Sequence, residues 1–170
     1  MLQSVSTSQC LNPPVSASTA EAMSGDPLLR FAGPVAGSHA LVIAPNGLDL
    51  MCSLLRQGCV AVTALRPSER SDHETYDLVL APRIASSAQI GRLIYQAKRA
   101  LVPTGRFLAF VPTGPAEPDQ DVAGLLVRSV RMGGFVAVQT RTVKDGLMLR
   151  ADLPMHGLSN AMPVLLRRQA

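Results

Sequence analysis

The chain of 170 residues is predicted to fold as an α/β domain whose sheet is mostly parallel. Short apolar runs at 39–44, 60–65, 76–81 and 107–111 have the length of buried strands. Amphipathic stretches of helical period separate the first run from the second and the third from the fourth. An Asp-Gly pair at 145–146 divides two final strand-like segments, 135–142 and 147–153, which is typical of an antiparallel hairpin.

The segment 76–111 is the clearest unit. Its apolar run 76–81 ends at Pro82, and Ser86 or Ser87 can cap the helix that follows. Apolar residues then recur every three or four positions: Ile90, Leu93, Ile94, Ala97 and Leu101. The expected solvent side carries Arg92, Gln96 and Arg99. The segment 103–105 (PTG) is expected to stop the helix and turn the chain into a strand at 107–111. Such a crossover is right-handed, so the two strands should be parallel.

The remaining elements follow in chain order. Residues 26–31 suggest a short helix that docks on the core, and 39–44 forms the first strand. The helix 48–58 has apolar residues that set a stripe, namely Leu48, Met51, Cys52, Leu54 and Leu55. The second strand is 60–65, a proline-containing loop spans 112–118, and a helix spans 122–132. Residues 1–25 lack periodicity and predict a disordered arm, 26–153 form the domain, and 154–170 form a tail.

Two stretches, YDLVLA at 76–81 and AKRALVPTGRF at 97–107, resemble the second half of the class I S-adenosylmethionine-dependent methyltransferase fold. The family's usual Gly-Gly turn appears here as Thr104-Gly105. A helix at 125–131, the sequence MGGF at 132–135 and two short strands are similar to the family's closing helix and hairpin. The resemblance covers 38–153 and implies a Rossmann-like fold. Because these motifs are scaffold, it implies fold more than activity.

Composition excludes several classes of protein. The net charge of +4 is spread along the chain, so we expect a solvated surface and no nucleic-acid partner. The sequence has no apolar run of about 20 residues, so we expect no membrane span. The start has no basic and apolar signal pattern. Cys10, Cys52 and Cys59 are scattered, so we expect no disulfide framework or zinc site and place the protein in the cytoplasm.

The resemblance implies a cofactor site built from a glycine-rich turn, an acid that ends the second strand, and an adenine pocket after the third strand. The turn here is Ala44-Pro45-Asn46-Gly47, which keeps one glycine of three. Pro45 has no N–H to donate, whereas Asn46-Gly47 is expected to supply positive φ angles for a tight turn.

The second strand ends in Arg66-Pro67-Ser68, and Glu69 is the nearest acid. A guanidinium group only donates hydrogen bonds, so Arg66 cannot accept from ribose hydroxyls. Arg66 leaves open a different site, a reader of the 2′-phosphate of NADP, although the GxGxxG turn of such proteins is missing.

Eleven residues connect Leu65 to Asp77, where the family places a helix, a strand and usually another helix. At about 3.3 Å per residue, this segment can cross the sheet but cannot build a strand and helix. We therefore expect the usual third strand and its adenine wall to be missing, with two strands on one side of the switch point and three on the other.

Other chemistry is sparse. His39, His73 and His156 are too far apart in sequence to indicate a triad or a metal site. Ser86-Ser87 lacks the GxSxG elbow. We expect Cys52 to pack in the core and Asp77 to accept hydrogen bonds from nearby backbone. Arg83 lies in the loop 82–86, where the resemblance places groups that face the substrate.

These losses predict a catalytically inactive methyltransferase-like protein without a cofactor, acting as a binding, regulatory or oligomerisation module. The second strand would be an exposed sheet edge, which favours a protein partner or self-association. The alternative is a working S-adenosylmethionine-dependent methyltransferase. In that case Ala44, Asn46 and Gly47 would lie near the methionine end of the cofactor, and Pro82 and Arg83 toward the substrate.

Overall fold

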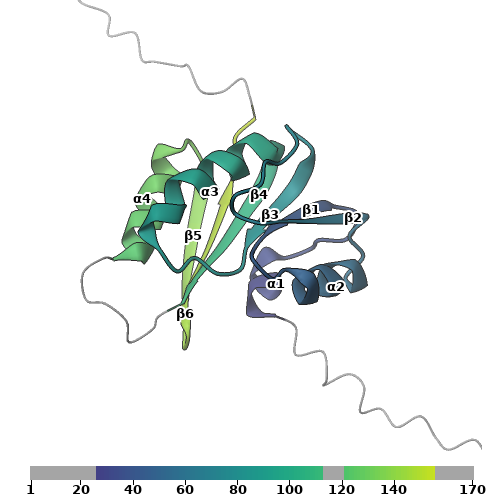
Figure 1. Ribbon diagram of the computed structural model, residues 1–170, viewed down its shortest axis with the longest axis horizontal. Coiled ribbons are helices and arrows are strands. Elements are labelled where there is room, and N and C mark those ends of the chain that lie inside the picture. The colour runs from purple at the N-terminus through teal and green to yellow at the C-terminus, as the bar shows by residue number, and fades with distance from the viewer. Residues whose placement is uncertain (1–25, 113–120, 156–170) are drawn as a thin grey trace, which may run out of the picture.

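A computed structural model describes residues 26–112 and 121–155 (Figure 1). Its elements are, in order, α1 Pro27–Ala32, β1 His39–Ile43, α2 Leu48–Arg56, β2 Ala61–Leu65, β3 Tyr76–Ala81, α3 Ser87–Ala100, β4 Leu101–Pro112, α4 Val122–Met132, β5 Val136–Val143 and β6 Gly146–Asp152. The predicted arm 1–25, most of the loop 112–118 and nearly all of the tail 154–170 lie outside the described residues.

The strands form one mixed sheet in the order β2-β1-β3-β4-β6-β5. The first four strands pair in parallel, while β6 is antiparallel to both β4 and β5. The predicted fold class is confirmed, and the usual third strand is indeed missing, since β2 leads directly to β3. The expected strand count on the far side of the switch point was wrong. Four strands lie there, because the C-terminal hairpin adds two strands beside β4.

Two helices cover each face of the sheet (Figure 1). Residues of α1 and α2 share one buried cluster with the sheet, and those of α3 and α4 share the other. Leu41, Val79 and Phe107 on the central strands have no exposed surface. No helix within the described ranges 26–112 and 121–155 has the length and apolarity to cross a membrane.

The apolar stripe of α2 differs from the prediction. Leu50 and Leu54 are buried, whereas Leu48 and Leu55 are 70% and 49% exposed. Cys52 is exposed, so its predicted core packing was wrong. The helix is apolar on more than one side, and the sequence alone does not say which side meets the sheet. Of the two described cysteines, Cys59 is the buried one. Its thiol donates to the Val35 carbonyl at 3.3 Å, and burial raises the pKa of that thiol.

The start of β4 also differs from the prediction. The strand begins at Leu101, directly after α3, so the PTG segment lies inside it. Thr104 has a φ of +69°, and the pairing with β3 shifts between Leu101 and Arg106, which marks a bulge. Thr104 N donates to the Leu153 carbonyl and Leu153 N donates to the Gly105 carbonyl. The segment is therefore held in the sheet by the chain that follows β6, a contact invisible in local sequence.

The C-terminal hairpin is antiparallel as predicted, with Lys144 and Asp145 between the strands. Gly146 does not take a positive φ. Its glycine is required by close approach, because a Cβ there would lie 2.2 Å from the Val111 carbonyl and 2.7 Å from the Phe110 ring.

We expect Gly146→Ala to destabilise the protein by about 1–3 kcal/mol, because β4 and β6 must move apart to admit the methyl group. Chemical denaturation would measure the free energy of unfolding. Gly91→Ala is the control, since Gly91 lies in α3 with nothing within 4 Å of a Cβ. It should stabilise the protein by up to about 1 kcal/mol through helix propensity. Equal effects at both positions would contradict the close approach.

Candidate functional site

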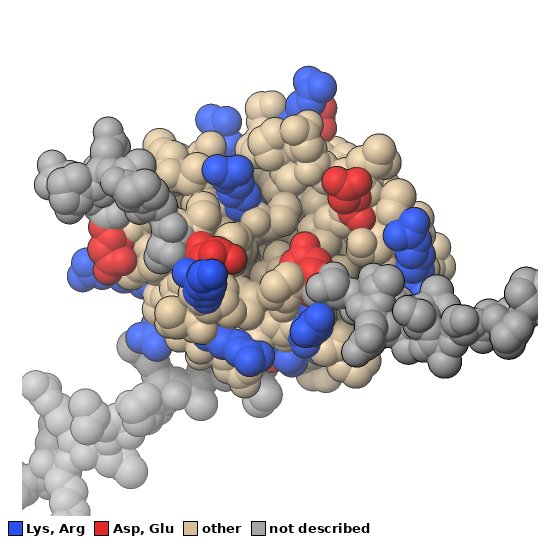
Figure 2. All heavy atoms as spheres, turned by 90° about the horizontal axis from the view of Figure 1, so that it is seen from below, with Lys and Arg blue, Asp and Glu red and all other residues tan. Residues whose placement is uncertain are grey.

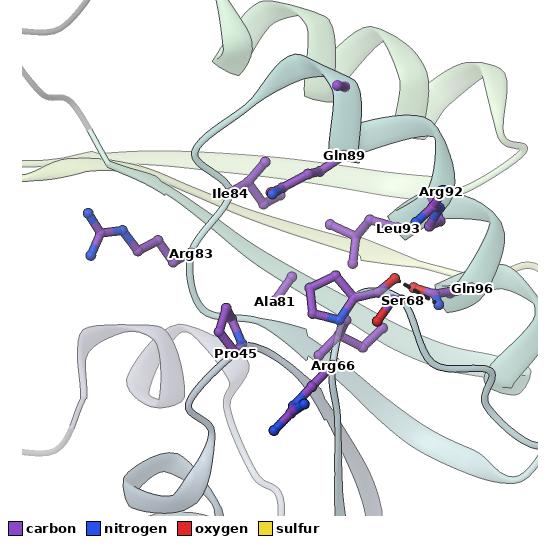
Figure 3. Close-up of a pocket in the computed structure, with 13 residues that line it drawn as sticks. Pro45, Arg66, Ser68, Ala81, Arg83, Ile84, Gln89, Arg92, Leu93 and Gln96 are labelled. Carbon is purple, nitrogen blue, oxygen red and sulfur yellow. Dashed lines mark hydrogen bonds between the residues drawn. The ribbon is translucent and has the colours of Figure 1, made fainter.

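A cavity of about 660 Å³ lies at the carboxyl ends of β1, β2 and β3, where the strand order reverses (Figure 3). In open α/β sheets, ligands bind in the crevice at this topological switch point. Four segments supply its walls: Ile43 and Pro45 after β1, Arg66–Ser68 after β2, Ala81, Arg83 and Ile84 around the end of β3, and Ala88, Gln89, Arg92, Leu93 and Gln96 of α3.

A smaller cavity of about 400 Å³ adjoins the first, and Pro45 and Arg66 line both. Its walls are the turn after β1 and the end of β2, namely Ala44, Pro45, Gly47, Ala64, Leu65, Arg66 and Glu69. The two cavities together follow the edge formed by the carboxyl ends of the parallel strands.

The turn after β1 is tight because Gly47 packs closely on β1, and not because of the predicted positive φ angles. Neither Asn46 nor Gly47 takes a positive φ, so that expectation was wrong. A Cβ at Gly47 would lie 3.0 Å from the Val42 side chain, so glycine lets the turn pack on β1. Ala44 N donates to the Leu65 carbonyl, which ties the turn to the end of β2. Helix α2 then begins without a side-chain cap among the described residues.

Glu69 returns an acid to the end of β2. Arg66 N donates to its carboxylate at 2.8 Å, and Glu69 N donates to the Arg66 carbonyl at 3.0 Å. Glu69 lines the smaller cavity together with Gly47. The sequence showed Glu69 only as the nearest acid after Arg66. Pro67 favours a turn, and this feature of the sequence could have indicated that Glu69 folds back toward the end of β2.

Gln96 holds the β2–β3 connection against α3. Its side-chain amide donates to the carbonyls of Pro67 and Glu69, and the residue is only 9% exposed, so its predicted solvent position was wrong. Its Oε1 is buried and has no hydrogen-bond partner among the described residues. Gln96 is thus a buried side chain that holds the segment with Pro67 in place as part of the wall of the larger cavity.

Three arginines line the larger cavity, Arg66, Arg83 and Arg92, and no acidic residue is among the described residues of its lining. All three are exposed. Figure 3 shows the side chains of Arg66 and Arg83 leading away from Ala81 in different directions. The cavity therefore has an apolar floor and a basic rim, which favours a ligand with an apolar body and an anionic group.

The predicted site residues divide between these cavities. Ala44 and Gly47 line the smaller one and Arg83 the larger one. Asn46 and Pro82 line neither. The structure brings in Glu69 and Gln96, which the sequence did not indicate as site residues.

His39, His73 and Asp77 line neither cavity of the site, and His156 lies outside the described residues. Asp77 accepts from His39 N at 2.8 Å at the opposite end of the sheet, as predicted for a structural acid. Within the described ranges, no three His, Cys, Asp or Glu side chains gather as a metal site.

Another cavity of about 750 Å³ lies away from the switch point, lined by Thr104, Arg106, Gly134, Phe135, Val136, Asp152, Leu153, Pro154 and Met155. Arg106 there lies 3.8 Å from Asp152 and donates to the Ala32 carbonyl, which docks α1. Burial and the neighbouring Arg150 lower the pKa of Arg106, against the opposing effect of Asp152. These contacts join structural elements and explain Arg106 without a ligand.

On the face shown in Figure 2, basic and acidic side chains are interspersed. The expectation that the protein has no nucleic-acid partner stays a prediction.

No family profile and no curated protein sequence matches this chain. Its solved structural neighbours include an S-adenosylmethionine-dependent methyltransferase from Mesorhizobium loti, with a TM-score of 0.59 and 11% identity over 74% of this chain and 95% of that one. A 1,6-didemethyltoxoflavin-N1-methyltransferase from Burkholderia thailandensis, solved with S-adenosylhomocysteine, has a TM-score of 0.55 and 15% identity over 75% of each chain. An O-methyltransferase family protein from Burkholderia thailandensis has a TM-score of 0.53 and 14% identity over 73% of this chain and 53% of that one. The chain has the class I methyltransferase-like fold.

Proposed function

We propose that the protein binds S-adenosylmethionine across the two cavities and transfers its methyl group to a small carboxylate-bearing acceptor. The observation that carries this proposal is Glu69, whose carboxylate accepts from Arg66 N at the end of β2 and which lines one cavity together with Gly47. A carboxylate at this position can accept from both hydroxyls of a ribose. The turn 44–47 would then hold the methionine end.

The residues present fit this cofactor in part. The third strand that would wall the adenine is missing, but Ala81, Ile84 and Leu93 give the larger cavity an apolar floor for a flat base. Pro45 offers no backbone donor to the cofactor. When bound, the cofactor supplies a methyl group on a positively charged sulfur, ready for attack by a nucleophile.

The basic rim indicates the class of acceptor. Arg83 and Arg92 can hold a carboxylate by charge-assisted hydrogen bonds. Among the described residues that line the two cavities, Glu69 is the one acid and none is a histidine, so these residues supply no general base besides Glu69. An acceptor that is already anionic would need no proton removed before it could accept the methyl group that the cofactor would supply.

A second function is supported by other observations. The turn keeps one glycine, Pro45 removes a donor, and the third strand is missing. These features favour a catalytically inactive binding or oligomerisation module that kept the fold. The two functions differ in one measurable property, the affinity for the cofactor.

Isothermal titration with S-adenosylmethionine and S-adenosylhomocysteine separates them. We expect micromolar binding of both, about −8 kcal/mol, for a methyltransferase. ATP and NADP are the comparison ligands, because Arg66 and the basic rim would attract any nucleotide phosphate. Binding of ATP or NADP alone would favour a nucleotide site. The absence of heat and of a thermal shift with all four ligands at millimolar concentration would support the inactive module.

A further inference from the structure

β2 is an open edge of the described sheet, paired with β1 alone. Its sequence AVTAL contains no charge and no proline, and all five residues stay in register with β1. Charges, prolines and bulges are among the devices by which proteins protect an edge from pairing with another chain. This edge has none of them.

The opposite edge, β5, is protected. It carries Arg141, Gln139 and two threonines, and its pairing with β6 shifts between Val136 and Gln139. Ala137 in that shift has a φ of +51°, which bends the strand. The sheet therefore has one protected edge, β5, and one open edge, β2.

The hydrogen bonds of β1 show which backbone N–H and C=O groups of β2 point away from β1. His39 N donates to Asp77 on β3, whereas Ala44 N donates to Leu65 on β2. Odd residues of β1 therefore face β3 and even residues face β2, because backbone groups alternate along a strand. In register with β1, the residues of β2 that point away from it are Val62 and Ala64.

An apolar flank of α2 continues this edge. With Leu50 and Leu54 against the sheet, Leu48 and Leu55 fall on the flank that a right-handed β1–α2–β2 crossover turns toward the free side of β2. They are 70% and 49% exposed, and Val60, just before β2, is 64% exposed. This is the side left uncovered by the missing strand-helix unit.

We propose that a second copy of this chain covers this surface, through antiparallel pairing of β2 with β2 across a two-fold axis at Thr63. Val62 then lies opposite the partner's Ala64, and each such pair exchanges two backbone hydrogen bonds. β2 has no charged side chain, so the symmetric pairing brings no like charges together.

The helices favour the same arrangement. The two-fold axis is perpendicular to the sheet, so both α2 helices lie on one face. Paired strands are about 4.8 Å apart, and α2 packs over the β1–β2 pair, so the two helix axes would lie about 10 Å apart. Packed helices are separated by about 8–10 Å. The apolar flank of each α2 would therefore meet the same flank of its partner, in an isologous contact.

Light scattering after size exclusion tests the pairing on the full chain. We expect a mass twice the 18.0 kDa of one chain. Val62→Pro should give the single-chain mass, because proline removes an outward N–H while the bonds to β1 remain. Val62→Ala keeps that N–H and should stay a dimer. Circular dichroism would show whether the proline variant is folded.

A second pair of variants tests the helix contact and does not depend on the proline variant. Leu55→Lys introduces like charges across the axis and should raise the dimer dissociation constant at least tenfold. Met132→Lys is the matched control, because Met132 is 81% exposed at the end of α4 and remote from β2. A wild-type chain that stays a monomer at its highest soluble concentration would overturn the proposal. So would an assembly that both Val62→Pro and Leu55→Lys leave intact.

Discussion

Glu69→Gln is expected to weaken the binding of S-adenosylhomocysteine about 10- to 100-fold. A hydrogen bond to a charged group contributes about 1.5–3 kcal/mol, and each 1.4 kcal/mol is a factor of ten in affinity. Glutamine keeps an oxygen that can accept from Arg66 N, so the turn after β2 should survive. Isothermal titration of wild type and variant would measure the difference.

Asp72→Asn is the matched control for this variant. Asp72 lies in the same β2–β3 connection, is exposed and lines neither cavity of the site, and its replacement changes the net charge equally. Equal weakening by both variants would show a long-range charge effect. Unchanged affinity in Glu69→Gln would show that the carboxylate does not contact the ligand.

The largest loss of stability is expected from Phe107→Ala, about 3–5 kcal/mol. Phe107 has no exposed surface, and its ring lies 5.7 Å from the ring of Phe135, between β4 and the start of the hairpin. The chain has four phenylalanines and no tryptophan, so few neighbours are large enough to fill the resulting cavity. Urea unfolding would measure the change.

Tyr95→Ala serves as the control for Phe107→Ala. Tyr95 is 65% exposed on α3, and its loss should change the free energy of unfolding by less than about 0.5 kcal/mol. A loss below about 1 kcal/mol in Phe107→Ala would contradict the packing of β4 against Phe135.

The elements of the fold could be predicted because their signals are local. The stripe of α3 and its Ser86 cap depend on residues a few positions apart, and the cap is present, with Ala88 N donating to the Ser86 hydroxyl at 3.2 Å. The β4 bulge depends on Leu153, about 50 positions away, and no local pattern reports such a contact. The buried side of α2 depends on which flank the sheet covers.

Those residues of the candidate site that lie close to the carboxyl ends of strands could be predicted. Ala44, Gly47 and Arg83 lie within four residues of the ends of strands, and parallel strands bring their carboxyl ends to one edge. Glu69 and Gln96 could not be identified in this way. Glu69 reaches the site through a closed turn, and Gln96 through hydrogen bonds to carbonyls 27 and 29 positions away.

The direct connection from β2 to β3 also affects how the chain folds. His39 and Asp77, which join the starts of the neighbouring strands β1 and β3, are 38 positions apart. A strand and a helix between β2 and β3 would lengthen the chain segment from His39 to Asp77. Each doubling of that length costs about 0.6 kcal/mol of closure entropy. Shorter contact separations also correlate with faster folding. We therefore expect the short connection to favour the pairing of β1 with β3 during folding.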